Sequence, residues 1–349
     1  MGMITRSLLA NDAPPPLAEE ENEPFDTLDL RIIGIFVILI GGLLGGFAPF
    51  VLPFFKSPFH WATLILRSFV AGVILSVALV HVAVEGAERL ESVEVFDGYP
   101  VSATCIIFGI LLQVFLESMT RRWLKYLTSK ANPQEQCLQE AQPEMGRKEV
   151  WTKEGTSSHD HGDGHTHQCI SVVRASSGVL AHSNPEKMNS STHKVQAYMF
   201  ELACSVHSVI IGIALGVTVS GRKDAINLVV VLIFHQLFEG IGLGSTVIKG
   251  GFSFLKSSMM IALFSLSTPI GIAAGIGISS TYDETSLNAA VSQGVLGSIS
   301  AGLLLYVTLV QMIAEDFSMT ENSKLWVQLA SFTSLVVGAG IMSVIGIWA

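Results

Sequence analysis

The segment 234-FHQLFEG-240 lies inside an apolar run from about residue 225 to residue 248 that contains no Lys or Arg. A run of this length is long enough to cross a bilayer as a helix. It nevertheless places an imidazole and a carboxylate near its centre, where an unpartnered charge is costly. His235 and Glu239 are four residues apart, so they lie on one helix face. Ionisable residues inside a membrane helix predict a functional site that faces a protein interior or water.

A second apolar run, from about residue 197 to residue 219, contains His207 and Ser208 about ten residues from its start. His235 is also about ten residues from the start of its own run. At about 1.5 Å of rise per residue, both imidazoles lie roughly 15 Å deep, at matching levels of the hydrocarbon core. Two imidazoles and a carboxylate at one depth predict a divalent-metal site of His207, His235 and Glu239.

These ligand types suit Zn²⁺ and Fe²⁺, and a more oxygen-rich set suits Mn²⁺. Ser208 and Gln236 each follow one of the histidines and offer neutral oxygens, either as weak ligands or as partners that orient the ligands. The alternative for these two is an interhelical hydrogen bond. The alternative for the whole group is a pair of core histidines bonded to backbone, with Glu239 protonated.

The composition is that of an integral membrane protein. Of 349 residues, 50% are hydrophobic and only 14% are charged, and the mean hydropathy is +0.53. Soluble domains carry about 25% charged residues. The net charge of −9 argues against nucleic acid and leaves cations as ligands. The sequence has no His-Glu-x-x-His, Gly-x-Ser-x-Gly or P-loop pattern, so ATP-driven pumping by this chain alone is not expected.

Eight apolar runs predict an all-α membrane protein with eight transmembrane helices. The runs span about 32–52, 61–84, 101–119, 197–219, 225–248, 258–280, 288–313 and 325–347. We therefore divide the chain into four parts: an acidic tail (1–30), helices 1–3 (31–128), a polar loop predicted to be disordered (129–195) and helices 4–8 (196–349). Glycines also recur four residues apart, which predicts close helix packing. These pairs are Gly41/Gly45, Gly42/Gly46, Gly212/Gly216, Gly240/Gly244 and Gly271/Gly275.

Basic residues set the orientation of membrane helices because they collect on the cytosolic side. They follow the third run and occur in the connections 1–2, 5–6 and 7–8: Lys56, Arg121, Arg122, Lys125, Lys130, Lys249, Lys256 and Lys324. Acidic residues dominate the other side, although the basic residues Arg222 and Lys223 also lie there. The balance predicts a cytosolic 129–195 loop and both termini outside the cytosol.

Two further groups predict contacts with cations. The second run carries His81, Glu85 and Glu88 at four- and three-residue spacing, which predicts an entrance collar on the non-cytosolic side; the alternative is a solvated helix end. The loop carries His159, His161, His165 and His167, and short His-rich tracts bind metals. The alternative for this tract is a solvated linker.

With these residues the chain resembles the ZIP (Zrt/Irt-like) divalent metal transporters, especially their plant and fungal branch. The resemblance rests on 206-VHSVIIG-212 and 235-HQLFEG-240, supported by 81-HVAVE-85 and 267-STPIG-271. It implies eight helices, with helices 4 and 5 framed by inverted three-helix repeats. It also implies movement of Zn²⁺, Fe²⁺ or related ions such as Mn²⁺ and Cd²⁺ into the cytosol, by elevator-like sliding of one helix group against another and frequently within a homodimer.

By this resemblance His207, His235 and Glu239 map onto the main transport site, and the metal is a substrate rather than a cofactor. Some members have Glu where this chain has Ile211, and some have Asp where it has Gln236. We therefore expect one principal ion. Glu85 stands where plant-like members often have Asp, which leaves the selectivity of the entrance open.

Two rival functions use the same residues. A membrane-embedded metal-dependent hydrolase or hydroxylase would hold a catalytic metal there and would need an open coordination position and a general base. A metal-sensing receptor would bind the ion without moving it. We expect a transporter, with the plasma membrane as its location and an internal compartment as the alternative.

Overall fold

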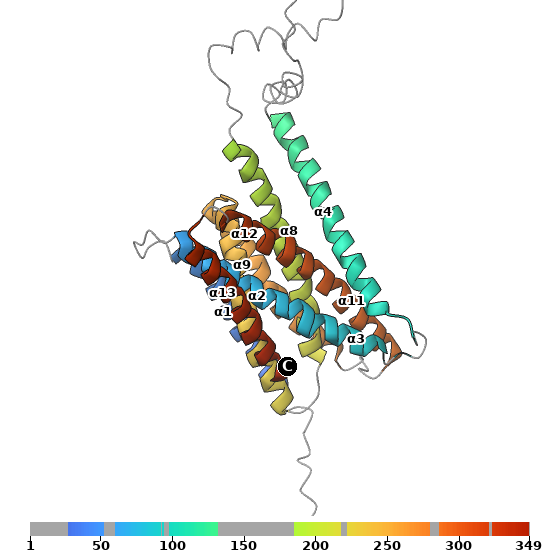
Figure 1. Ribbon diagram of the computed structural model, residues 1–349. Helices are drawn as coiled ribbons and strands as arrows, with labels where there is room; N and C mark the ends of the chain where they lie inside the picture. Colours follow the sequence, from blue (N-terminus) through green and yellow to red (C-terminus); the bar gives the residue numbers. More distant parts are fainter. Residues whose placement is uncertain are drawn as a thin grey trace, which may run out of the picture.

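The computed structural model describes residues 27–51, 60–91, 93, 98–131, 185–217, 222–279, 286–320 and 323–348. Within these ranges the protein is all-helical (Figure 1). Eight of the described helical spans are long and apolar enough to cross a membrane. These spans confirm the predicted all-α class and the eight transmembrane helices.

Six of the spans are single α-helices: α1 (Leu28–Val51), α4 (Val101–Ala131), α8 (Pro185–Val217), α9 (Arg222–Lys249), α10 (Phe254–Ile278) and α13 (Leu325–Ile345), which a short 3₁₀ turn η6 (Gly346–Trp348) follows. The other two spans each contain a π-helical segment. The second span consists of α2 (His60–Ser76), η3 (Val77–Val82) and α3 (Ala83–Glu91). The seventh consists of α11 (Leu287–Tyr306), η5 (Val307–Ile313) and α12 (Ala314–Thr320).

Some helices continue beyond the apolar runs that predicted them. α4 ends at Ala131, and α8 already begins at Pro185, so the segment 185–195 is helical although the sequence predicted it as loop. Proline is favoured at the first position of a helix because its fixed φ suits that position and its missing N–H is not needed there. Hydropathy detects only the part of a helix that lies in lipid. The rest of the predicted loop and the acidic tail up to residue 26 lie outside the described residues.

Glycines join the helices in pairs. α1 packs on α9, and α8 packs on α10. A Cβ added to Gly240 would lie 2.9 Å from the carbonyl oxygen of Gly42, and one added to Gly216 would lie 2.7 Å from the Cα of Gly275. The predicted glycine pairs therefore serve close backbone packing. We call α1, α8, α9 and α10 the first helix group.

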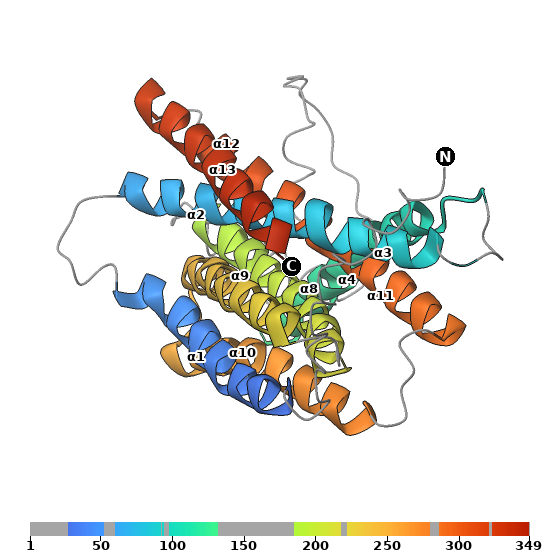
Figure 2. The ribbon, with the colours of Figure 1, turned by 90° about the horizontal axis from the view of Figure 1, so that it is seen from below.

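The remaining spans pair in the same way. α2 packs on α13 and α4 packs on α11, with α3 also against α11. A Cβ on Gly72 would lie 2.8 Å from the backbone nitrogen of Ala339, and one on Gly302 would lie 3.0 Å from the Cα of Gly109. We call these spans, with α12, the second helix group. Figure 2 shows α1, α9 and α10 on one side of the bundle and α2, α13 and α11 on the other, with α8 between them.

Side chains fill the interface between the two groups. Val70 and Ile74 of α2, Phe200 of α8 and Leu243 of α9 are buried in one apolar cluster with residues of α11. A Cβ on Gly242 of α9 would meet the side chains of Val70 and Phe200 rather than backbone. Backbone contacts therefore tie each group together internally, whereas rearrangeable side chains separate the groups.

Candidate metal centre

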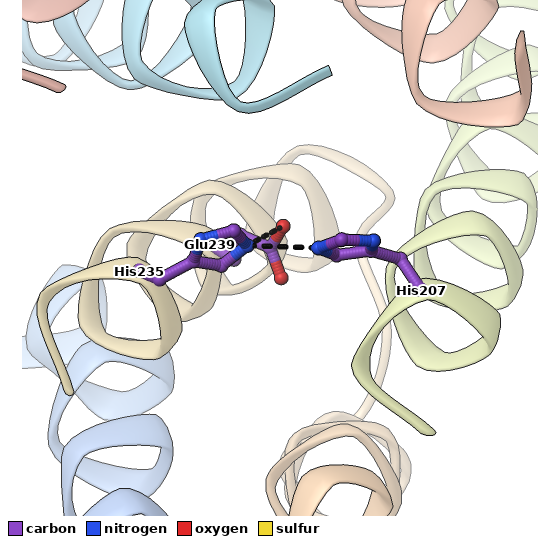
Figure 3. A group of neighbouring side chains, drawn as sticks. All are labelled: His207, His235 and Glu239. Atoms are coloured by element: carbon purple, nitrogen blue, oxygen red, sulfur yellow. Dashed lines mark hydrogen bonds and ion pairs between the residues drawn. The ribbon is translucent and has the colours of Figure 1, made fainter. Parts of the chain in front are cut away.

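His235 and Glu239 lie on one face of α9, and that face points toward α8. His207 projects from α8 to meet them (Figure 3). The two imidazole Nε2 atoms are 3.0 Å apart, and His235 Nε2 lies 3.1 Å from Glu239 Oε1. The exposed fractions are 2% for His207, 3% for His235 and 0% for Glu239. The three residues that helix periodicity and matched depth singled out in the sequence therefore lie together in one buried cluster.

The spacing of these atoms suits a single transition-metal ion. Zn²⁺ binds His nitrogen and carboxylate oxygen at about 2.0–2.2 Å, so two ligands at 90–110° around one ion lie about 2.8–3.5 Å apart. Both measured separations fall in that interval. One ligand atom from each of the three residues lies within 4.8 Å of the others, and no other described His, Cys, Asp and Glu residues form such a group.

The carboxylate also has spare acceptor capacity. Glu239 Oε2 is buried and makes no hydrogen bond to any described residue. A buried carboxylate oxygen without a donor is costly, because the group loses its hydration and gains nothing in exchange. A cation between Glu239 and the two imidazoles would remove that cost. The donor set and its unsatisfied oxygen therefore fit a bound divalent ion.

A hydroxyl from the second helix group orients His207. Ser300 of α11 is fully buried, and its Oγ lies 3.3 Å from His207 Nδ1. With Nδ1–H donating to this oxygen, the lone pair of His207 is on Nε2, which points toward Glu239 and His235. Partners of this kind fix the tautomer of a ligating histidine. Sequence analysis missed Ser300, because a serine in an apolar helix has no spacing signal that ties it to a histidine 93 residues away.

Gln236 and Ser208 are buried beside the ligands, but the Gln236 amide is directed to α10. Its Oε1 accepts a hydrogen bond from Thr268 Oγ1 at 2.9 Å, and its Nε2 donates to the Phe264 carbonyl at 3.4 Å. This is the interhelical hydrogen bond that the sequence left open as an alternative to ligation. Ser208 Oγ makes no hydrogen bond to any described residue. Cys204, three residues before His207, is fully buried among apolar side chains and packs as a core residue.

The three predicted entrance residues differ in their surroundings. His81 is half-buried, and its Nε2 lies 3.2 Å from the Met342 carbonyl of α13. Glu85 is exposed and pairs with Arg89 at 2.9 Å, and Glu88 is exposed. The π-helical segment that contains His81 alters the register between it and α3. The four loop histidines, 159, 161, 165 and 167, lie outside the described residues.

The chain is similar to a known protein family and to several named proteins. A family model described as "ZIP Zinc transporter" matches residues 28–346. "Zinc transporter 9" of Oryza sativa subsp. japonica is 34% identical, over 95% of this chain and 92% of its own length. "Zinc transporter 3" of Arabidopsis thaliana is 32% identical, over 91% and 84%. "Fe(2+) transport protein 3, chloroplastic" of Arabidopsis thaliana is 27% identical, over 100% and 92%.

Proposed function

The chain belongs to the ZIP zinc transporter family, and from this premise we propose that it carries Zn²⁺ or Fe²⁺ across a membrane into the cytosol on His207, His235 and Glu239. The observation that carries the choice of site is the convergence of three ligand atoms within 4.8 Å, on two helices long and apolar enough to span a membrane. Zinc and iron transport is the activity of the family, and relatives named for each ion match the chain. A transporter rather than an enzyme is the function that this membership assigns.

The ligand set supports one principal ion per site. The carboxylate and two imidazoles supply three donors, and the Gln236 amide is engaged by Thr268 and Phe264 on α10. Ile211 offers no ligand one turn after His207. A three-donor site leaves coordination positions for water, and this suits a carrier because a transported ion must leave again. Release requires a site that binds tightly enough to select and weakly enough to let go.

Two features support the inverted three-helix repeat. The second and seventh spans each carry a π-helical segment, η3 and η5. The first and sixth spans, α1 and α10, each contain an internal proline, Pro49 and Pro269, and each packs through glycines on α9 or α8. Corresponding features in spans 1–2 and 6–7 are what two related halves around α8 and α9 would produce. Sliding of the first helix group against the second is then the movement that carries the ion.

A flux experiment tests the transport proposal. The purified chain in proteoliposomes should move Zn²⁺ or Fe²⁺ down its gradient, and competition with Mn²⁺ and Cd²⁺ should give the order of preference. Alanine in place of His207, His235 or Glu239 should abolish this flux in a correctly inserted protein. Unchanged flux and selectivity in those variants would overturn the assignment of the site. Metal binding with neither flux nor turnover would point to a sensor, and turnover without flux to a hydrolase.

Location and assembly extend the proposal. The chain is a multi-pass membrane protein, and the plasma membrane and a homodimer stay predictions. Fractionation of cells that produce the full chain would test the first, and native mass spectrometry of the purified protein would test the second.

A further inference from the structure

A second group of ionisable side chains lies at the end of the bundle toward which α4 and α8 extend (Figure 1). Basic residues predict this end to be cytosolic. Its members come from four helices: Arg67 of α2, His193 of α8, Lys249 of α9, and Glu315 and Asp316 of α12. Nothing in the transport of the ion through His207, His235 and Glu239 accounts for this second group.

Within the second helix group, Arg67 binds Asp316. Arg67 Nε donates to Asp316 Oδ2 at 3.1 Å, and Nη2 approaches Oδ1 to 3.0 Å. Only 5% and 3% of the two side chains are exposed. This buried pair fixes α12 to α2, so that Glu315, the next residue along, is presented toward α8 and α9.

Glu315 is bound from the first helix group on two sides. Lys249 Nζ lies 2.9 Å from Glu315 Oε1 and 3.8 Å from Asp316 Oδ1. His193 Nδ1 lies 3.0 Å from the same Glu315 oxygen and 3.0 Å from Gln196 Oε1 on its own helix. One carboxylate therefore collects a lysine from α9 and a histidine from α8.

These contacts differ in kind from the other ion pairs of the protein. Four other ion pairs of the described residues each lie within one helix group: Arg89–Glu85, Arg121–Glu117, His235–Glu239 and Arg67–Asp316. The contacts of His193 and Lys249 with Glu315 and Asp316, by contrast, cross between the groups at one end of the bundle. The Arg89–Glu85 pair at the opposite end is local to α3.

The exposure of the crossing pair allows it to open. The side chains of Lys249 and Glu315 are 18% and 16% exposed, so they lie near the surface, although the Lys249 ammonium itself is buried. A lysine ammonium is a compact charge on a flexible stem, so it exchanges a carboxylate for water without moving the backbone. The pair is therefore suited to hold two bodies together reversibly.

We propose that Lys249 and His193 of the first helix group grip Glu315 of the second as a latch that keeps the cytosolic end closed, and that this latch opens each time an ion is released to the cytosol. The inference rests on the proposed transport function, because a latch on a static bundle would have nothing to release. It assigns to Lys249 a role in the conformational cycle rather than in holding the metal.

The buried thiol of Cys204 offers a native reporter of opening. It lies on α8 between His193 and His207 and is fully buried in the structure. The full chain, with Cys105, Cys137 and Cys169 changed to serine, would be reconstituted without metal. The rate at which a membrane-impermeant maleimide labels Cys204 from the cytosolic face would then be measured.

Lys249→Gln and Glu315→Gln should each raise the labelling rate on the order of fivefold, as expected for loss of one partly exposed ion pair. Glu315→Gln also removes the contact with His193, so the double variant should label at the rate of Glu315→Gln alone, because the Lys249–Glu315 interaction is already lost there. Lys249→Arg keeps the charge and should label like the parent, as should Lys256→Gln, which removes an exposed lysine of α10.

Additive increases in the double variant, a Lys249→Arg variant as fast as Lys249→Gln, or unchanged labelling in both single variants would each overturn the latch. Labelling without metal measures the latch alone, and zinc flux in the unmutated chain measures the transport function alone. Failure of one proposal is therefore distinguishable from failure of the other.

Discussion

The metal centre and the cluster around Glu315 use the same residue types with opposite charge balance. In both, a buried or partly buried glutamate meets histidine from α8 or α9. The cluster supplies its own cations, because Arg67 and Lys249 face Asp316 and Glu315. The partners of the metal centre among the described residues include no lysine or arginine, and Glu239 Oε2 makes no hydrogen bond to them. Carboxylates paired with lysine or arginine side chains hold helices together. A carboxylate without such a partner can instead bind a metal cation.

The largest effect should come from removing the carboxylate that lacks a resident cation. Glu239→Gln should reduce zinc transport by more than about a hundredfold, since loss of even a residue that orients a ligand costs about 10- to 100-fold in affinity. Zinc flux into proteoliposomes measures this, and the rise of melting temperature with added Zn²⁺ should vanish in the variant. Cys204→Ala, a change on α8 three residues from His207, is the matched control and should retain transport. A Glu239→Gln protein that transports zinc normally would show that the carboxylate without a lysine or arginine partner is not the one that binds the ion.

Removing the arginine that pairs with Asp316 should lower the stability of the fold and not the affinity for metal. Arg67→Met leaves Asp316 buried beside only Lys249 at 3.8 Å and should destabilise the fold by about 3 kcal/mol. Denaturation of the detergent-solubilised protein measures this loss. The double variant Arg67→Met/Asp316→Leu removes both charges and should recover most of it, because a well-packed apolar pair often replaces a buried ion pair without loss. A single variant as stable as the parent would show that Asp316 does not depend on Arg67.

The two clusters were unequally visible in the sequence. His235 and Glu239 are four residues apart on one helix, and His207 lies at a matching depth. Helix periodicity and rise per residue were therefore sufficient to predict that the three residues lie together. Lys249 and Glu315 belong to helices of different groups, whose interface is formed by side chains such as Val70 and Leu243, and no local pattern links them.

Register and helix length show a similar limit. His81, Glu85 and Glu88 share a face of an ideal α-helix, but the π-helical segment η3 changes that register. The start of α8 at Pro185 was missed because the apolar run begins later than the helix. The number of spans, by contrast, depends only on apolar length and could be predicted.

An intermediate effect should follow from the hydroxyl that orients His207. Ser300→Ala should raise the KM for Zn²⁺ about tenfold while the maximal rate changes little, because the variant populates the wrong imidazole tautomer more often. Ser300→Thr, which keeps the hydroxyl, should restore most of the affinity. Ser298 is the matched control: it lies on the same helix and is equally buried, but it bonds Ser102 at 2.9 Å. If Ser298→Ala raised KM as much, the effect of Ser300 would be on packing of α11 and not on the metal centre.

The smallest effect should come from the exposed carboxylates of α3, which face water rather than a buried partner. Glu88→Gln should raise the KM for Zn²⁺ about twofold at low ionic strength and leave it unchanged at high salt, since exposed charges act over a distance that salt shortens. Glu85→Gln should do less, because Arg89 lies 2.9 Å from Glu85 and already offsets its charge. Zinc uptake at two salt concentrations measures both, with Glu91→Gln near the exposed end of α3 as the comparison. A loss of transport in Glu88→Gln that persists at high salt would mean that this carboxylate binds the ion directly. Glu88 would then resemble the buried ligands and would not be a charge that attracts the ion from a distance.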